Sequence, residues 1–283
     1  MKVLFAAITL LAVLFLIYLF LLAPRRRRTS VLPFLRLPYA HRGLHGKGVP
    51  ENSLSAFRAA VAAGYGIELD VQLSADGEVM VFHDENLLRM TGCDASLYGK
   101  TAAELSALCL ADSEEHIPTL AEVLSLVGGR VPLLVEIKSD HGTVAVCEKT
   151  AALLDSYAGE YMIESFHPFA VNWFRKNRPA VVRGQLSAHL FKKGDRTPSM
   201  FIAENLLLNF LSRPDFVAYD YHNKNRFSFA LCRAVYRPYT LAWTVKDYEG
   251  LAAAKHFDAI IFESLTEKEL KDAHRLANEE KKA

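Results

Sequence analysis

The sequence predicts a barrel of eight parallel strands and helices, the (β/α)8 or TIM-barrel fold of the α/β class. From residue 39 onward, short apolar runs alternate about eight times with segments of helical periodicity. Polar residues gather at the carboxyl ends of the expected strands, where active sites of this fold lie. An open doubly wound sheet is the alternative, but neither GxGxxG nor GxxxxGK[ST] follows any of these runs.

The expected elements follow one another in regular order. The strands are expected at residues 39–42, 66–72, 131–138, 160–166, 181–186, 215–219, 239–245 and 259–263. The helices are expected at residues 52–63, 119–127, 143–156, 168–177, 199–211, 225–236, 247–256 and 266–281. Capping residues support three of the helix starts: Asn52 or Ser53, Thr119, and Thr266 with Glu269 three residues later.

One long stretch, 84–118, lacks the alternation. Long segments of this kind inside a compact domain are usually functional. We expect it to form a small insertion in a barrel domain that spans 39–283.

The amino terminus predicts a membrane anchor over residues 1–24. Residues 3–23 carry no charge and, as a helix, are long enough to span a bilayer. A cleaved signal peptide is the alternative, but its apolar core is shorter and ends in small residues. A basic linker, 25–38, begins with four arginines, which also suit anionic lipid head groups. By the positive-inside tendency the anchor is single-pass in the cell membrane, with the catalytic domain in the cytoplasm.

Composition excludes several classes of function. The chain has 33 basic and 32 acidic residues, so no basic surface for nucleic acid stands out. The four cysteines, Cys93, Cys109, Cys147 and Cys232, show no CxxC spacing, which argues against disulfides and a thiolate metal site.

Charged residues interrupt an otherwise apolar strand at Glu68 and Asp70. Side chains two apart in a strand point to the same face. A second strand, 79–82, follows Asp76-Gly77, a tight-turn signature. A hairpin that turns there places His83 opposite Asp70.

The expected strand 131–138 repeats the pattern with Glu136 and Lys138. On an edge strand both would face solvent, but a closed barrel has no edge. Inward carboxylates at 68, 70 and 136 repel one another without a counter-ion, and all-oxygen ligands favour Ca²⁺ or Mg²⁺ over zinc. A network of carboxylates and Lys138 without metal is the alternative.

Two histidines, His41 and His83, come from separate strand ends. One suits removal of a proton from a nucleophile, and the other suits delivery of a proton to a leaving group. Arg42 offers a planar set of donors for a phosphate, and Lys138 adds a second positive charge. A metal, an arginine and a lysine around one point describe a site for an anionic phosphorus centre.

These motifs in this order resemble the glycerophosphodiester phosphodiesterase family. They are Ala40-His41-Arg42-Gly43, Pro50-Glu51-Asn52-Ser53, Glu68-Leu69-Asp70-Val71, Asp76-Gly77, His83-Asp84 and Glu136-Ile137-Lys138. The resemblance covers most of residues 39–265. It implies a (β/α) barrel related to phosphatidylinositol-specific phospholipases C, with an insertion after the His-Asp strand. It also implies hydrolysis of glycerophosphodiesters to sn-glycerol 3-phosphate and an alcohol, generally with a divalent cation.

The resemblance also implies roles for individual residues. His41 and His83 match the general acid–base pair, and Glu68, Asp70 and Glu136 match the metal ligands. The residues matching phosphate or substrate contacts are Arg42, Lys138, Glu51, Asn52 and Trp243. Glu51 is a further candidate for a metal contact, and a packed core position is the alternative for Trp243. Glu263 stands where many members carry aspartate.

Three functions follow from the sequence. The main expectation is a membrane-anchored enzyme for soluble glycerophosphodiesters. A lysophospholipase D acting on membrane lysophospholipids is the second, because the anchor brings the site to lipid. A catalytically inactive scaffold barrel is the third, and the complete set of polar residues argues against it.

Overall fold

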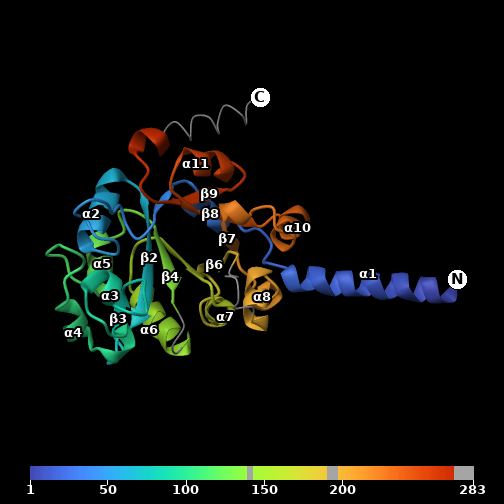
Figure 1. Cartoon of the computed structure of the whole chain (residues 1–283), viewed down its shortest axis with the longest axis horizontal. Coiled ribbons are helices and arrows are strands. Elements are labelled where there is room, and N and C mark those ends of the chain that lie inside the picture. The colour runs from blue at the N-terminus through green and yellow to red at the C-terminus, as the bar shows by residue number, and fades with distance from the viewer. Residues whose placement is uncertain (139–142, 190–196, 271–283) are drawn as a thin grey trace.

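The computed structural model describes residues 1–138, 143–189 and 197–270. Within these ranges, eight parallel strands close into a barrel, which confirms the predicted fold (Figure 1). They are β1 (Tyr39–Ala40), β2 (Gly66–Leu73), β4 (Leu133–Ile137), β5 (Tyr161–Ser165), β6 (Val182–Ser187), β7 (Phe216–Asp220), β8 (Tyr239–Val245) and β9 (Ala259–Phe262). The ring closes because β1 pairs with both β2 and β9.

Six helices lie where the sequence predicts them, and one predicted helix, at residues 199–211, does not. Matching helices are α2 (Leu54–Ala63), α5 (Leu120–Val127), α6 (Thr143–Asp155), α7 (Pro168–Asn177), α10 (Phe227–Tyr236) and α11 (Tyr248–Ala254). The single helix expected at 199–211 is wrong: it is two helices, α8 (Pro198–Glu204) and α9 (Asn209–Ser212). Leu206 has a φ of +58°, in the left-handed region, which breaks the helical path between them.

The last expected helix, 266–281, lies largely outside the described residues. Its start has the predicted capping box: the Thr266 backbone N–H donates to Glu269 at 2.8 Å. The Glu269 backbone N–H donates to the Thr266 hydroxyl at 3.3 Å.

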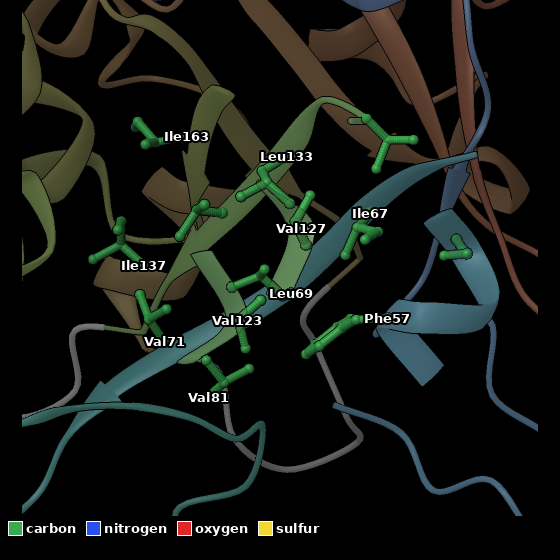
Figure 2. Packing of buried hydrophobic residues seen from close by; sticks show 14 of the residues in the cluster. Phe57, Ile67, Leu69, Val71, Val81, Val123, Val127, Leu133, Ile137 and Ile163 are labelled. Atoms are coloured by element: carbon green, nitrogen blue, oxygen red, sulfur yellow. The ribbon is translucent and has the colours of Figure 1, made fainter. Parts of the chain in front are cut away.

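The main apolar core lies between the outer face of the barrel wall and its helices. Figure 2 shows Leu69 and Val71 of β2 on the same side of the wall as Val123 and Val127 of α5. Side chains alternate along a strand, so residues between these positions face the barrel interior. Glu68, Asp70 and Gln72 are the inward residues of β2.

The hairpin after β2 differs from the predicted one by one residue. β3 (Val79–Val81) pairs antiparallel with β2, but Phe82 and not His83 lies opposite Asp70, donating its N–H to the Asp70 carbonyl at 3.0 Å. The reason is the turn between β2 and β3, which is closed by a 3.0 Å hydrogen bond from the Ser74 backbone N–H to the Glu78 carbonyl. His83 lies just beyond the end of β3.

The predicted insertion, 84–118, contains α3 (Leu88–Thr91), the 3-10 helix η2 (Leu97–Gly99) and α4 (Ala102–Ser106). Its apolar side chains form a cluster with Met80 of β3 and Phe82, in which Leu87, Leu97, Leu105 and Ile117 are fully buried. This cluster makes the insertion a small packed lobe beside β3.

The amino-terminal helix α1 (Lys2–Leu22) extends away from the barrel (Figure 1) and is long and apolar enough to cross a membrane. Its last turn packs on the barrel domain. Leu22 is fully buried against residues of β7 and α10, and Tyr18 shares a 2.6 Å hydrogen bond with Ser228. The Tyr236 hydroxyl donates to the Leu19 carbonyl at 2.7 Å.

The linker after α1 is a strap along the amino-terminal end of the barrel. It includes the 3-10 helix η1 (Thr29–Leu35), whose Phe34 joins the barrel's interior apolar cluster. Arg28 donates twice to Asp215, at 2.8 and 2.6 Å, and Arg27 donates to Asp258 at 3.1 Å. These arginines therefore bind the barrel itself.

Candidate active site

Three acidic side chains meet at the carboxyl ends of β2 and β4. Glu68, Asp70 and Glu136 are all buried, and each offers a carboxylate oxygen within 4.8 Å of the others. The strand register produces this arrangement, because Asp70 and Glu136 are direct partners in the parallel pair. The structure therefore brings these three predicted site residues together.

Repulsion and burial dominate the electrostatics of this cluster. Burial, together with the Asp70 and Glu136 charges, raises the pKa of Glu68 well above its ordinary value. Burial also raises the pKa of Glu136 to about 7. The pKa of Asp70 is lowered despite its burial, because Lys138, His83 and Arg42 attract its charged form.

The donor set fits a hard divalent cation. Three buried carboxylates repel one another, which favours a positive charge between them, and oxygen-only ligands are those that Ca²⁺ and Mg²⁺ prefer. Lys138 contributes part of that charge: its ammonium group lies 3.0 Å from Asp70 and 2.7 Å from Glu136. Arg42 contributes as well, with Nε 3.4 Å from Asp70 and its backbone N–H donating to Glu68 at 2.8 Å.

His41 follows β1 and is held by a carboxylate. Its Nδ1 lies 2.8 Å from Glu263 Oε2, and Lys246 donates to the other Glu263 oxygen at 2.9 Å. The hydrogen bond from His41 lowers the pKa of Glu263 to about 2. Burial lowers the pKa of His41, although Glu263 opposes this effect. A neutral ring that donates from Nδ1 keeps its lone pair on Nε2.

His83 is held in the same way from the other side. Its Nδ1 lies 2.6 Å from Asp84, and burial lowers its pKa. Gln72 fixes the surrounding loop: its amide nitrogen lies 2.9, 3.0 and 3.1 Å from the carbonyl oxygens of Phe82, His83 and Asp84. His83 and Asp70 interact electrostatically although they are not cross-strand partners.

The segment from Arg42 to Asn52 has a strained backbone. Arg42 and Asn52 have φ angles of +55° and +54°, and neither is glycine. The Asn52 amide donates to Asp70 at 2.9 Å, while its Oδ1 is buried without a partner among the described residues. At Gly43, with a φ of +81°, a Cβ would lie 2.8 Å from the Cβ of Ala56. The hydrogen bonds from the Arg42 backbone to Glu68 and from Asn52 to Asp70 hold these residues at the acidic cluster.

Glu51 lies outside the acidic cluster and binds two arginines. Arg42 donates to it at 2.7 Å and Arg89 donates to it at 2.6 Å. Arg89 also donates to Asp84 at 2.5 Å. Because Arg89 belongs to the insertion, the lobe is tied to both His83 and Arg42 through carboxylates.

Trp243 lies half-buried near the end of β8. Its ring packs edge-to-face on Phe166, with centroids 5.5 Å apart. The indole N–H is buried and has no partner among the described residues.

Several residues around the site escaped the sequence reasoning. Gln72, Arg89 and Glu164 were not singled out at all, and Asp84, Glu263 and His45 were given no role, although the His45 ring lies within 4.8 Å of His41 and Glu263. Glu164 is the in-register partner of Glu136, and its burial and the Glu68 charge raise its pKa well above the ordinary value. The alternation of side chains along a strand could have identified Gln72 and Glu164, because both lie on the same face of the strands as the acidic residues. Nothing local to Arg89 signals its contacts.

Comparison with known proteins places the chain among phosphodiesterases. Residues 41–276 match the model of the glycerophosphoryl diester phosphodiesterase family. A glycerophosphodiester phosphodiesterase of Caldanaerobacter subterraneus subsp. tengcongensis is 36% identical over 162 residues, which cover 53% of this chain and 66% of that protein. The human protein named lysophospholipase D GDPD1 is 31% identical over 142 residues, covering 46% of this chain and 44% of that protein.

Solved structures share the fold. A phosphodiesterase of Oleispira antarctica, in complex with the product sn-glycerol-3-phosphate, superposes with a TM-score of 0.70 at 24% identity. The superposition covers 87% of this chain and 99% of that one. A glycerophosphodiester phosphodiesterase of Thermotoga maritima superposes with a TM-score of 0.61 at 25% identity, covering 85% and 98%.

Proposed function

This chain belongs to the glycerophosphoryl diester phosphodiesterase family, and we propose that it hydrolyses glycerophosphodiesters to sn-glycerol 3-phosphate and an alcohol. One observation carries the proposal: the buried acidic cluster lies beside two histidines, each with a carboxylate on Nδ1. The Oleispira protein, in complex with sn-glycerol-3-phosphate, supports the same product class here.

The acidic cluster is the proposed metal site. Glu68, Asp70 and Glu136 would hold a divalent cation, Ca²⁺ or Mg²⁺. Such an ion, when bound, supplies positive charge for the phosphoryl oxygens and relieves the repulsion that raises the pKa of Glu68. Asn52 would keep the Asp70 carboxylate oriented through its 2.9 Å hydrogen bond.

Arg42 and Lys138 would bind the substrate phosphate. Both cations already lie next to Asp70, so the phosphate would approach at the same point as the acidic cluster. Glu51 would hold the Arg42 guanidinium in place, which limits the rearrangement needed as charge builds on the phosphoryl oxygens. Trp243 would line the substrate side of the barrel mouth.

His41 and His83 would move the protons. One imidazole takes a proton from the attacking oxygen as its bond to phosphorus forms, and the other gives a proton to the departing alkoxide as its bond to phosphorus breaks. Burial lowers the pKa of both rings, which keeps a neutral base available near pH 7. Glu263 and Asp84 would hold each ring with Nε2 toward the reaction.

The amino-terminal helix is the proposed membrane anchor, uncleaved and single-pass. The burial of Leu22 and the Tyr18 and Tyr236 hydrogen bonds support this, since they join α1 to the folded domain. The proposed organisation is therefore an anchor over 1–24, a strap over 25–38 and a catalytic barrel over 39–283, facing the cytoplasm.

A substrate panel tests the function. The full chain in detergent is assayed with glycerophosphocholine and glycerophosphoglycerol, with and without a chelator. We expect release of sn-glycerol 3-phosphate from at least one ester, lost with chelator and restored by Ca²⁺ or Mg²⁺. If no alcohol is released from these esters or from bis(p-nitrophenyl) phosphate, a binding or scaffold role is favoured instead.

A further inference from the structure

An apolar groove opens directly beside the proposed metal site. Its volume is about 820 Å³, and Glu136 and Lys138 form part of its wall. Away from these two charges, the groove runs between α7 and α8. Its apolar lining includes Phe166, Phe169, Met200, Ile202, Ala203 and Leu208.

The chemistry of this groove does not match a glycerophosphodiester alone. Glycerol, phosphate and a small head group are polar, and the residues proposed to bind them lie at the charged end. The remaining wall is mainly aliphatic and aromatic, with Ser165, His167 and Ser199 as its polar members. The volume of the groove is in the range that buries a ligand of several hundred daltons. Covering an apolar wall of this size favours binding only when the group that covers it is also apolar.

The groove lies on the side of the molecule from which α1 departs. Figure 1 shows α8 next to the base of α1, with α10 on the other side. Phe210 of α9 packs on Phe20 of α1 at a centroid distance of 5.2 Å. Phe201 of α8 is 53% exposed, and Phe227 of α10 is 68% exposed. If α1 spans a bilayer, these exposed aromatic side chains and the α8 wall lie near its surface, where aromatic rings are favoured.

We propose that this groove holds the single acyl chain of a lysophospholipid whose phosphodiester lies at Arg42 and Lys138. The inference rests on the proposed function and specifies its substrate. Water would add to phosphorus and the bond from phosphorus to the head-group oxygen would break. The head-group alcohol takes one proton, and a monoacylglycerol phosphate remains. Its chain would reach the site from the bilayer side of α8.

A chain-length series with the full-length protein in detergent tests the groove. Glycerophosphocholine is compared with lysophosphatidylcholines carrying six, eight and ten carbons. We expect kcat/KM to rise by about three- to four-fold for each methylene that enters the groove.

Ala203→Trp fills the groove, and Ala252→Trp, at an exposed position of α11, is the matched control. We expect Ala203→Trp to remove the rise with chain length while kcat/KM for glycerophosphocholine stays within about two-fold. The control should keep the rise.

The outcomes separate the two proposals. Hydrolysis of glycerophosphocholine with no rise along the series overturns the acyl-chain site and leaves the proposed function standing. A rise that survives Ala203→Trp also overturns it, as does an equal loss on all four substrates in that variant. No hydrolysis of any of the four overturns the acyl-chain site, and the assay with glycerophosphoglycerol then decides whether the proposed function stands.

Discussion

At the scale of single residues, hydrogen bonds between charged side chains hold the two histidines of the site in place. Each histidine has a carboxylate on Nδ1, Glu263 for His41 and Asp84 for His83. Each of these carboxylates also accepts from a cation, Lys246 or Arg89. Partners of this kind fix the tautomer and the orientation of an imidazole without contacting the reacting atoms.

Replacing either histidine should abolish turnover and leave the fold intact. For His41→Ala and His83→Ala we expect kcat to fall by about 10²- to 10⁴-fold, because each removes one proton transfer. Thermal stability and metal affinity should stay close to wild type, since neither ring belongs to the acidic cluster. Steady-state kinetics, thermal unfolding and metal titration check this. Normal turnover in either variant would remove that residue from the mechanism.

Glu263→Gln should shift the pH dependence of the reaction. Glu263 raises the pKa of His41 through a hydrogen bond and its charge, so its neutral replacement lets that pKa fall further. The limb of the kcat–pH profile that His41 controls should therefore move to lower pH. The kcat should drop by about one to two orders of magnitude as the ring loses its orienting partner.

The same change at an exposed position, Glu249→Gln, is the control for this profile. An unshifted limb in Glu263→Gln would show that His41 does not depend on this carboxylate.

At the scale of elements, two strands organise the site. β2 directs Glu68, Asp70 and Gln72 to the barrel interior, and its register with β4 brings Glu136 alongside. Gln72 then holds the loop that carries His83. Because side chains alternate along a strand with a period of two, the single strand β2 carries both Gln72, which supports the His83 loop, and two of the proposed metal ligands.

The far side of the barrel depends on close packing between strands. Gly184 of β6 lies in register with Phe216 of β7, and a Cβ at position 184 would overlap the Phe216 ring. We expect Gly184→Ala to lower the free energy of unfolding by about 1–3 kcal/mol, measured by thermal or urea unfolding.

Gly99→Ala, where a Cβ meets nothing within 4 Å and φ is not positive, should change stability by less than about 1 kcal/mol. Equal stability of the two variants would contradict this account of the packing.

At the scale of the whole molecule, the barrel separates its two ends. The proposed active site lies at the carboxyl ends of the strands, and the strap with Arg27 and Arg28 covers the amino-terminal end. Arg183, 2% exposed, shares Asp215 with Arg28 at 3.7 and 2.6 Å. The segment after α1 therefore belongs to the folded domain.

Two truncations should separate anchoring from stability. A chain beginning at Leu22 keeps the buried Leu22 and the strap but loses the Tyr18 and Leu19 hydrogen bonds, so it should leave the membrane fraction with only a small fall in melting temperature. A chain beginning at Pro38 also loses Val31, Phe34 and the Arg28–Asp215 pair. Its free energy of unfolding should fall by more than about 3 kcal/mol. Membrane fractionation and thermal unfolding check both, and equal melting temperatures would show that the strap contributes nothing.

The barrel and the residues that meet at its mouth could be predicted from the amino-acid sequence alone. The alternation of elements and the spacing of Glu68, Asp70, Glu136 and Lys138 sufficed, because strand parity assigns each side chain to a face. It also indicated the helix that could span a membrane, since length and composition decide that property.

The distant groups that hold the site together could not be predicted from the sequence, because tertiary packing brings them into contact. Glu263 lies 222 residues from His41 in the chain, and Arg89 reaches Glu51 from a separate lobe. The one-residue difference in the β2–β3 register, the docked strap and the groove between α7 and α8 were likewise decided by the tertiary structure. Such contacts depend on how turns close and how helices pack across the barrel, which local patterns of residues do not specify.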